Sequence, residues 1–88
     1  MVWKIDYTEE ARRSLHRLDP KVSARIVAFM EKRVAALSDP TQIAERLKGG
    51  LRDYWRYRVG DYRIICEIKK AVVTVVVTRV GHRREIYR

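Results

Sequence analysis

Residues 53–68 read DYWRYRVGDYRIICEI, and this stretch predicts two antiparallel strands joined by a tight turn. In residues 53–59, side chains alternate in the two-residue period of a strand with one buried face. Gly60-Asp61 suits a hairpin turn, and residues 62–68 supply the second strand. The expected core positions are Trp55, Tyr57 and Val59, whereas Tyr54, Arg56 and Arg58 share the opposite face.

A third strand is expected further along the chain. Residues 72–78 are nearly all valine and threonine, as in an internal strand buried on both faces. Lys69-Lys70 is the expected turn before this strand, and Gly81 is expected to break it. Residues 83–87 are then predicted to form a short last strand at the sheet edge.

The first half of the chain predicts an edge strand followed by two helices. Residues 2–7 alternate like a strand, and Thr8 precedes two glutamates as a helix N-cap does. Asp19-Pro20 starts a second helix, whose apolar residues recur every three or four positions as far as Leu37. Asp39-Pro40 ends it, and residues 41–50 form a connection with room for a short helical turn. The predicted fold is α+β, a single domain over residues 1–88 with a helical hairpin on a small antiparallel sheet, in the order β-α-α-β-β-β.

The charge of the chain points to a polyanionic partner. Twenty lysines and arginines stand against eleven acidic residues, a formal net charge of +9. Residues 51–88 hold ten basic and four acidic side chains, and eight of those ten are arginine. Arginine binds phosphate with two parallel hydrogen bonds, whereas lysine acts as a point charge. This bias favours nucleic acid over a basic surface that only maintains solubility.

The remaining composition is typical of a cytoplasmic protein without a cofactor. The longest apolar stretch, residues 71–77, is too short to cross a bilayer, and the first residues do not resemble a signal peptide. Cys66 has no second cysteine to pair with, and its place in the strand pattern predicts core packing. The sequence shows no cluster of His, Cys and Asp at metal-ligand spacing, so neither metal nor cofactor is expected.

Several segments in order resemble the RelE family of toxins from type II toxin–antitoxin systems. The resemblance covers nearly the whole chain and is most specific in residues 47–50 (LKGG), 54–58 (YWRYR), 60–65 (GDYRII) and 80–87 (VGHRREIY). RelE and ParE toxins share a microbial RNase-like fold, which agrees with the predicted topology. Members of the RelE branch cleave messenger RNA in the ribosomal A site. The resemblance therefore implies a metal-independent endoribonuclease.

The resemblance also implies a set of site residues. By motif, the catalytic positions are Arg58, Arg63, Arg83 and Tyr87, and Arg56 helps to clamp the scissile phosphate. Lys48, Arg79, His82 and Arg84 are expected contacts to RNA. Other interpretations stay open, because Arg56 and Arg58 can be ordinary solvent-facing residues, Arg63 can pair with Glu67, and Tyr87 can simply cover the sheet. For Trp55 and Tyr57, packing is expected rather than base stacking.

Position 58 departs from the pattern of the family. A well-known member has a lysine there that acts as general base, whereas arginine has a pKa well above that of lysine and stays protonated. Arg58 then only stabilises charge, or the base is another residue. The candidates are His82, with an ordinary pKa near 6.5, Tyr87 as phenolate, and Glu85.

Two other functions are compatible with the same fold. One is a ParE-like inhibitor of DNA gyrase without RNase activity. The other is a catalytically weak toxin that acts mainly in complexes with antitoxin and operator. All three functions imply an acidic, RelB-like antitoxin that forms a hetero-oligomer with the toxin and folds upon binding. The basic residues at positions 56, 58, 63 and 83 favour the nuclease, with messenger RNA and the ribosome as its partners.

Overall fold

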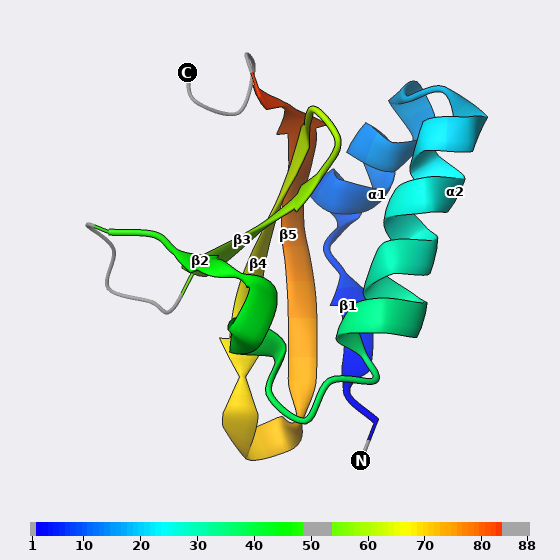
Figure 1. Cartoon of the computed structure of the whole chain (residues 1–88). Coiled ribbons are helices and arrows are strands. Elements are labelled where there is room, and N and C mark those ends of the chain that lie inside the picture. The colour runs from blue at the N-terminus through cyan, green and yellow to red at the C-terminus, as the bar shows by residue number, and fades with distance from the viewer. Residues whose placement is uncertain (1, 49–53, 84–88) are drawn as a thin grey trace.

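A computed structural model describes residues 2–48 and 54–83 of the chain. Over these residues, two helices pack on one face of a five-stranded sheet with the order β1-β5-β4-β3-β2 (Figure 1). The elements are β1 (Lys4–Tyr7), α1 (Glu9–Arg17), α2 (Pro20–Ala28), β2 (Glu45–Arg46), β3 (Tyr54–Val59), β4 (Tyr62–Lys69) and β5 (Thr74–His82). The α+β prediction, with a helical hairpin on a sheet, is confirmed.

The sheet is mixed rather than wholly antiparallel. The three neighbouring pairs that involve β2 to β5 are antiparallel, but β1 runs parallel to β5. Lys4 aligns with Thr74, and Tyr7 aligns with Val77. These two strands are separated by both helices and three strands, so no hairpin turn fixes their relative direction. An alternation pattern alone does not carry that information.

Both helices start at the predicted caps. The Thr8 hydroxyl accepts a hydrogen bond from the Ala11 N–H at 3.1 Å and donates one to the Thr78 carbonyl, which ties α1 to β5. Asp19 Oδ1 accepts from the Lys21 N–H at 2.8 Å, with Pro20 in the first turn. Each cap satisfies an N–H group that has no partner within its helix.

The second helix ends earlier than the apolar spacing predicts. After α2 the chain forms one π-helical segment, η1 (Phe29–Val34), in which the Ala35 N–H donates to the Met30 carbonyl. The Ala35 carbonyl then accepts from the Trp3 N–H at 2.9 Å. Because Trp3, the residue before β1, takes this carbonyl, the chain leaves the helix before Leu37, which lies outside it.

The last strand is displaced from its predicted position. A 3-10 turn, η3 (Lys70–Val72), and Val73 with φ of 48° precede β5. The strand continues through Gly81, which aligns with Arg63 of β4, so the predicted break is wrong. Glycine adopts extended backbone as well as turns, so its presence did not decide between them. Arg83 already lies outside β5, and residues 84–87 of the predicted edge strand lie outside the described residues.

The core lies between the helices and one face of the sheet. Its fully buried members are Ala11, Ile26, Met30, Val34, Tyr57, Ile64, Cys66, Val75 and Val77. Burial raises the pKa of the Cys66 thiol well above its usual value, as expected for a thiol used in packing. The Tyr57 hydroxyl donates to the Pro40 carbonyl at 2.6 Å and so fixes the short 3-10 helix η2 (Pro40–Ile43). The helical turn expected in the connection is therefore present, and the two-residue strand β2 follows it unpredicted.

Candidate nucleic-acid interface

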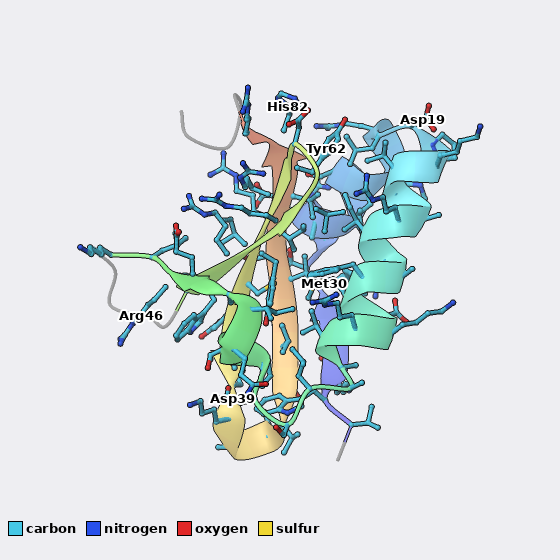
Figure 2. The ribbon with its side chains drawn as sticks, viewed as in Figure 1. Asp19, Met30, Asp39, Arg46, Tyr62 and His82 are labelled. Atoms are coloured by element: carbon cyan, nitrogen blue, oxygen red, sulfur yellow. The ribbon has the colours of Figure 1, made fainter. Side chains whose placement is uncertain are left out.

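Arginines from three strands share the face of the sheet opposite the core, which we call the arginine face. Arg58 of β3 aligns directly with Arg63 of β4, and in the next row Arg56, Ile65 and Arg79 align across β3, β4 and β5. Nitrogen-bearing side chains gather on the side of the strands away from the helices (Figure 2). Like charges directly opposite each other destabilise a sheet. This placement therefore favours an anionic ligand over a purely structural role.

The guanidinium of Arg63 is buried at the β3–β4 turn. Only 9% of the residue is exposed, and its Nη1 donates to the carbonyls of Gly60 at 3.0 Å and Tyr62 at 3.1 Å. The pairing with Glu67 considered from the sequence is not formed. Gly60 has φ of 59°, a conformation that glycine adopts without strain, so the predicted tight turn is present. Among the described residues the buried Arg63 Nε–H has no acceptor, so an anion at this position would supply one.

Glu45 is the residue of this face that the sequence did not reveal. It belongs to β2, aligns with Arg56, and forms an ion pair with Arg56 Nη2. Its second carboxylate oxygen, Oε2, lies 3.7 Å from Arg58 Nη2. The Arg56 side chain is only 10% exposed, so the solvent-facing position considered for it is wrong. Glu45 lies in a connection without strand alternation, and no local pattern marks it as a partner of two arginines.

A hollow of about 440 Å³ opens beside these two arginines. Arg56 and Arg58 form one wall, and Arg33 of η1 adds a third guanidinium to the lining. Residues 42–45 close another side, with Glu45 as the acidic group of the lining. The hollow therefore combines several cations with one carboxylate beside the sheet.

The remaining predicted site residues fall into three groups. Arg83 is exposed, and its backbone N–H donates at 2.9 Å to the Asp61 carbonyl, so it starts at the turn that holds Arg63. Arg79 is exposed on the arginine face, and Lys48 is exposed just beyond β2. Arg84 and Tyr87, as well as the alternative base Glu85, lie outside the described residues. The structure thus brings Arg56, Arg58, Arg63 and Arg79 together on one face and anchors Arg83 at its end.

His82 lies on the other face of the sheet. It aligns with Tyr62, and the two rings meet edge to face with centroids 5.5 Å apart (Figure 2). Tyr62 precedes Arg63, and neighbouring residues in a strand point to opposite faces. The sheet therefore does not bring His82 beside Arg58 and Arg63.

Neither a metal cluster nor a membrane span is found in the part of the chain that the structure describes. Within residues 2–48 and 54–83, no three His, Cys, Asp or Glu side chains are grouped to hold a metal ion. In the same residues, no helix is long and apolar enough to cross a membrane.

Known proteins match the chain over nearly its full length. Residues 5–87 match the family described as the ParE toxin of the type II toxin–antitoxin system parDE. Toxin RelG of Mycobacterium tuberculosis is 34% identical over 88 residues, which cover 100% of this chain and 99% of that protein.

Two solved structures have the same fold. In the crystal structure of the toxin–antitoxin complex RelBE2 from Mycobacterium tuberculosis, one chain superposes with a TM-score of 0.85 at 30% identity, covering 97% of this chain and 95% of that one. The isolated RelE toxin of E. coli superposes with a TM-score of 0.70 at 19% identity, covering 97% and 90%. The topology and these matches agree, and the chain belongs to the RelE/ParE superfamily of toxins from type II toxin–antitoxin systems.

Proposed function

We propose that this toxin is a ribosome-dependent endoribonuclease that cleaves messenger RNA with its own side chains and without a metal ion. The observation that carries the proposal is the alignment of Arg58 directly opposite Arg63 on a face that also holds Arg56 and Arg79. Like charges directly opposite each other destabilise a sheet, and the single Glu45 carboxylate beside Arg56 and Arg58 offsets only part of this charge. Arginine binds phosphate with two parallel hydrogen bonds, so a phosphodiester is an anion that suits this face.

Cleavage by the ribose 2′-OH has three requirements that this face can meet. The attacking oxygen must lose a proton, the negative charge on the phosphoryl oxygens must be stabilised, and the 5′-oxygen must gain a proton as it leaves. Arg63 is held in place by two backbone carbonyls and stabilises the phosphoryl charge together with Arg58. Arg83, which starts at the same turn, stabilises or protonates the leaving oxygen.

Glu45 is our candidate for the group that accepts the 2′-OH proton. Arg58 stays protonated, and His82 lies on the other face. The Glu45 carboxylate lies 3.7 Å from Arg58 and is half exposed, so a substrate can reach it. Tyr87 remains the proposed group that stacks on a base or orients the ribose.

The proposed partner that silences the toxin is an acidic, RelB-like antitoxin. One of the similar structures is the toxin chain of a RelBE2 toxin–antitoxin complex. An acidic segment over the arginine face would neutralise the groups that bind phosphate. We place this activity in the cytoplasm, where messenger RNA and ribosomes are found. RNA cleavage that persists at saturating antitoxin would contradict this part of the proposal.

Primer extension on translated messages after brief induction tests the nuclease. We expect discrete cuts within codons for the wild type, and a loss of roughly 100- to 1,000-fold for Arg63→Ala and Arg58→Ala, the usual effect of removing a transition-state donor. Arg13→Ala is the matched control, because Arg13 is an exposed arginine on α1 that pairs only weakly with Glu9 at 3.7 Å.

Inhibition of DNA gyrase is the second candidate, because the matching family is described as the ParE toxin. In that case transcripts stay intact, replication stalls, and Arg63→Ala leaves the RNA pattern unchanged. Unchanged transcripts after induction of a toxic wild type would therefore exclude the nuclease.

A further inference from the structure

A second cationic hollow lies on the sheet away from the arginine face. It measures about 290 Å³ and is lined by Arg46, Trp55, Ile68 and Lys70. Arg46 and Trp55 align across β2 and β3 and therefore share a face. Because Trp55 precedes Arg56 in the same strand, that face is opposite the one with Arg56 and Arg58. Figure 2 shows Arg46 at the margin of the molecule away from both helices.

Trp55 is less buried than Tyr57, the next residue of β3 on the same face. Tyr57 is 0% exposed and its hydroxyl is bonded inside the core, whereas the Trp55 ring packs against the core and is only partly buried. The guanidinium carbon of Arg46 lies 6.0 Å from the centroid of the Trp55 ring. Ile68, at 7% exposure, forms an apolar wall, and the exposed Lys70 adds a second positive charge.

An aromatic ring and two cations that line one hollow have the chemistry of a nucleotide-binding site. Any of the bases can stack on an aromatic side chain, and the flanking cations hold the phosphates. An indole gives the largest aromatic surface for this purpose and also attracts guanidinium groups. Packing alone, expected for Trp55 from its alternation, does not require two cations in the same hollow.

We propose that Arg46, Trp55 and Lys70 form a second RNA-binding site, in which an unpaired base stacks on the Trp55 ring and its phosphates contact Arg46 and Lys70. The choice of RNA as ligand rests on the proposed function. The site lies on the opposite face from Arg58 and Arg63, so it binds RNA away from the cleaved bond. Its role is to anchor the toxin on RNA, independently of the chemistry.

Tryptophan fluorescence can report on this site directly. The chain has two tryptophans, and Trp3→Phe leaves Trp55 as the only one. The probe is a short single-stranded 2′-O-methyl oligoribonucleotide, which binds as RNA does but has no 2′-OH to attack. We expect the oligonucleotide to quench Trp55 emission, whereas tripolyphosphate, which has charge but no bases, leaves the emission unchanged.

Lys70→Ala and Lys69→Ala form a matched pair for the charge contribution. Both lysines are exposed neighbours, but only Lys70 lines the hollow. Lys70→Ala should weaken the binding detected by quenching severalfold and lower its salt dependence by about 0.7, the value for one phosphate contact to a single strand. Lys69→Ala should change the affinity less. Trp55→Leu, measured by anisotropy of a labelled oligonucleotide, should weaken binding by roughly 5- to 100-fold, which corresponds to the loss of one stacked base.

The outcomes separate this site from the proposed nuclease. Arg58→Ala should reduce cleavage by roughly 100- to 1,000-fold, as above, and leave the quenching of Trp55 intact. The proposal of a second site is wrong if the wild type cleaves RNA but Trp55 emission does not respond to the oligonucleotide. It is also wrong if the two lysine variants bind the oligonucleotide alike. Quenching without any cleavage would instead overturn the proposed nuclease and support the site. If Trp3→Phe fails to fold, the lysine pair and Trp55→Leu measured by anisotropy decide the question.

Discussion

The two faces of this sheet have opposite chemistry although the same three strands form both. The face that packs on the helices holds Tyr57, Ile64, Cys66, Val75 and Val77, all with 0% exposure. The other face holds Arg56, Arg58, Arg63 and Arg79. Burial of each large apolar side chain stabilises the fold by about 1.5–3 kcal/mol, whereas adjacent like charges oppose folding. The first face therefore supplies the stability that the second requires.

The largest expected effect is on the apolar face. Ile64→Ala removes a fully buried side chain in the central strand and should lower the free energy of unfolding by about 2–5 kcal/mol. Small domains are only about 5–15 kcal/mol stable in total, so much of the protein would unfold at growth temperature. Urea denaturation followed by circular dichroism measures the change.

Ile65→Ala is the control for this prediction. Ile65 is the next residue in β4 but faces the arginines and is only partly buried. Its truncation leaves no enclosed cavity, so the loss should be clearly smaller than for Ile64→Ala. Equal losses for the two variants would mean that the two faces do not differ in their contribution to stability.

This division between faces could be predicted from the sequence because it depends on a period of two. The alternation in residues 54–59 separates Tyr57 and Val59 from Arg56 and Arg58, and the structure keeps that separation. The caps at Thr8 and Asp19 are equally local, because each depends on one side chain and a nearby N–H. Features encoded within a few residues were therefore predictable.

Features that depend on partners far away in the chain could not be predicted from the sequence. The parallel direction of β1, the end of the second helix at the Ala35 carbonyl and the pairing of Glu45 each require a contact between residues far apart in the chain. Gly81 shows the same limit, because only its alignment with Arg63 tells that it continues a strand. Of the candidate site, the side-by-side arginines followed from the pattern together with the family resemblance, whereas the carboxylate between them did not.

The next effect concerns that carboxylate. Glu45→Gln keeps the shape of the side chain but removes the charge paired with Arg56, so we expect a loss of about 1–2 kcal/mol in unfolding free energy. The half-exposed position of Glu45 limits the loss, because solvent screens the pair. If Glu45 accepts the 2′-OH proton, cleavage on ribosomes should also fall by roughly 100- to 10,000-fold. Affinity for an uncleavable oligonucleotide should rise, since the arginine face gains one net positive charge.

Cleavage at the wild-type rate by Glu45→Gln would remove Glu45 from the chemistry. It would then serve only to position Arg56, because the glutamine amide oxygen can still accept a hydrogen bond from the guanidinium. Glu31→Gln is a suitable comparison, since Glu31 accepts a hydrogen bond from Tyr7 at 2.8 Å and does not line the hollow beside Arg56 and Arg58. That variant should keep both cleavage and oligonucleotide affinity.

A smaller effect tests how the apolar face supports the carboxylate. The Tyr57 hydroxyl donates to the Pro40 carbonyl, and this bond fixes the segment that leads into β2. Tyr57→Phe should lower the unfolding free energy by about 1 kcal/mol, the usual value for one buried hydrogen bond. Hydrogen exchange at residues 41–47 should increase relative to exchange in α1. Unchanged exchange there would show that the two faces are held independently.

The smallest expected effect has the opposite sign. Arg58 lies directly opposite Arg63 and is well exposed, so Arg58→Thr removes a like-charge pair and introduces a residue that favours strands. We expect the free energy of unfolding to rise by about 0.2–1 kcal/mol, while cleavage is lost. The gain should be largest at low ionic strength and shrink in 1 M salt, because exposed charges are screened. The contact between Arg58 and Glu45 is lost at the same time, but it is long at 3.7 Å, so its loss offsets little of the gain in unfolding free energy. A variant that is both inactive and less stable at every salt concentration would show that Arg58 stabilises the fold. The arginine face would then not lower the stability of the protein in exchange for binding an anion.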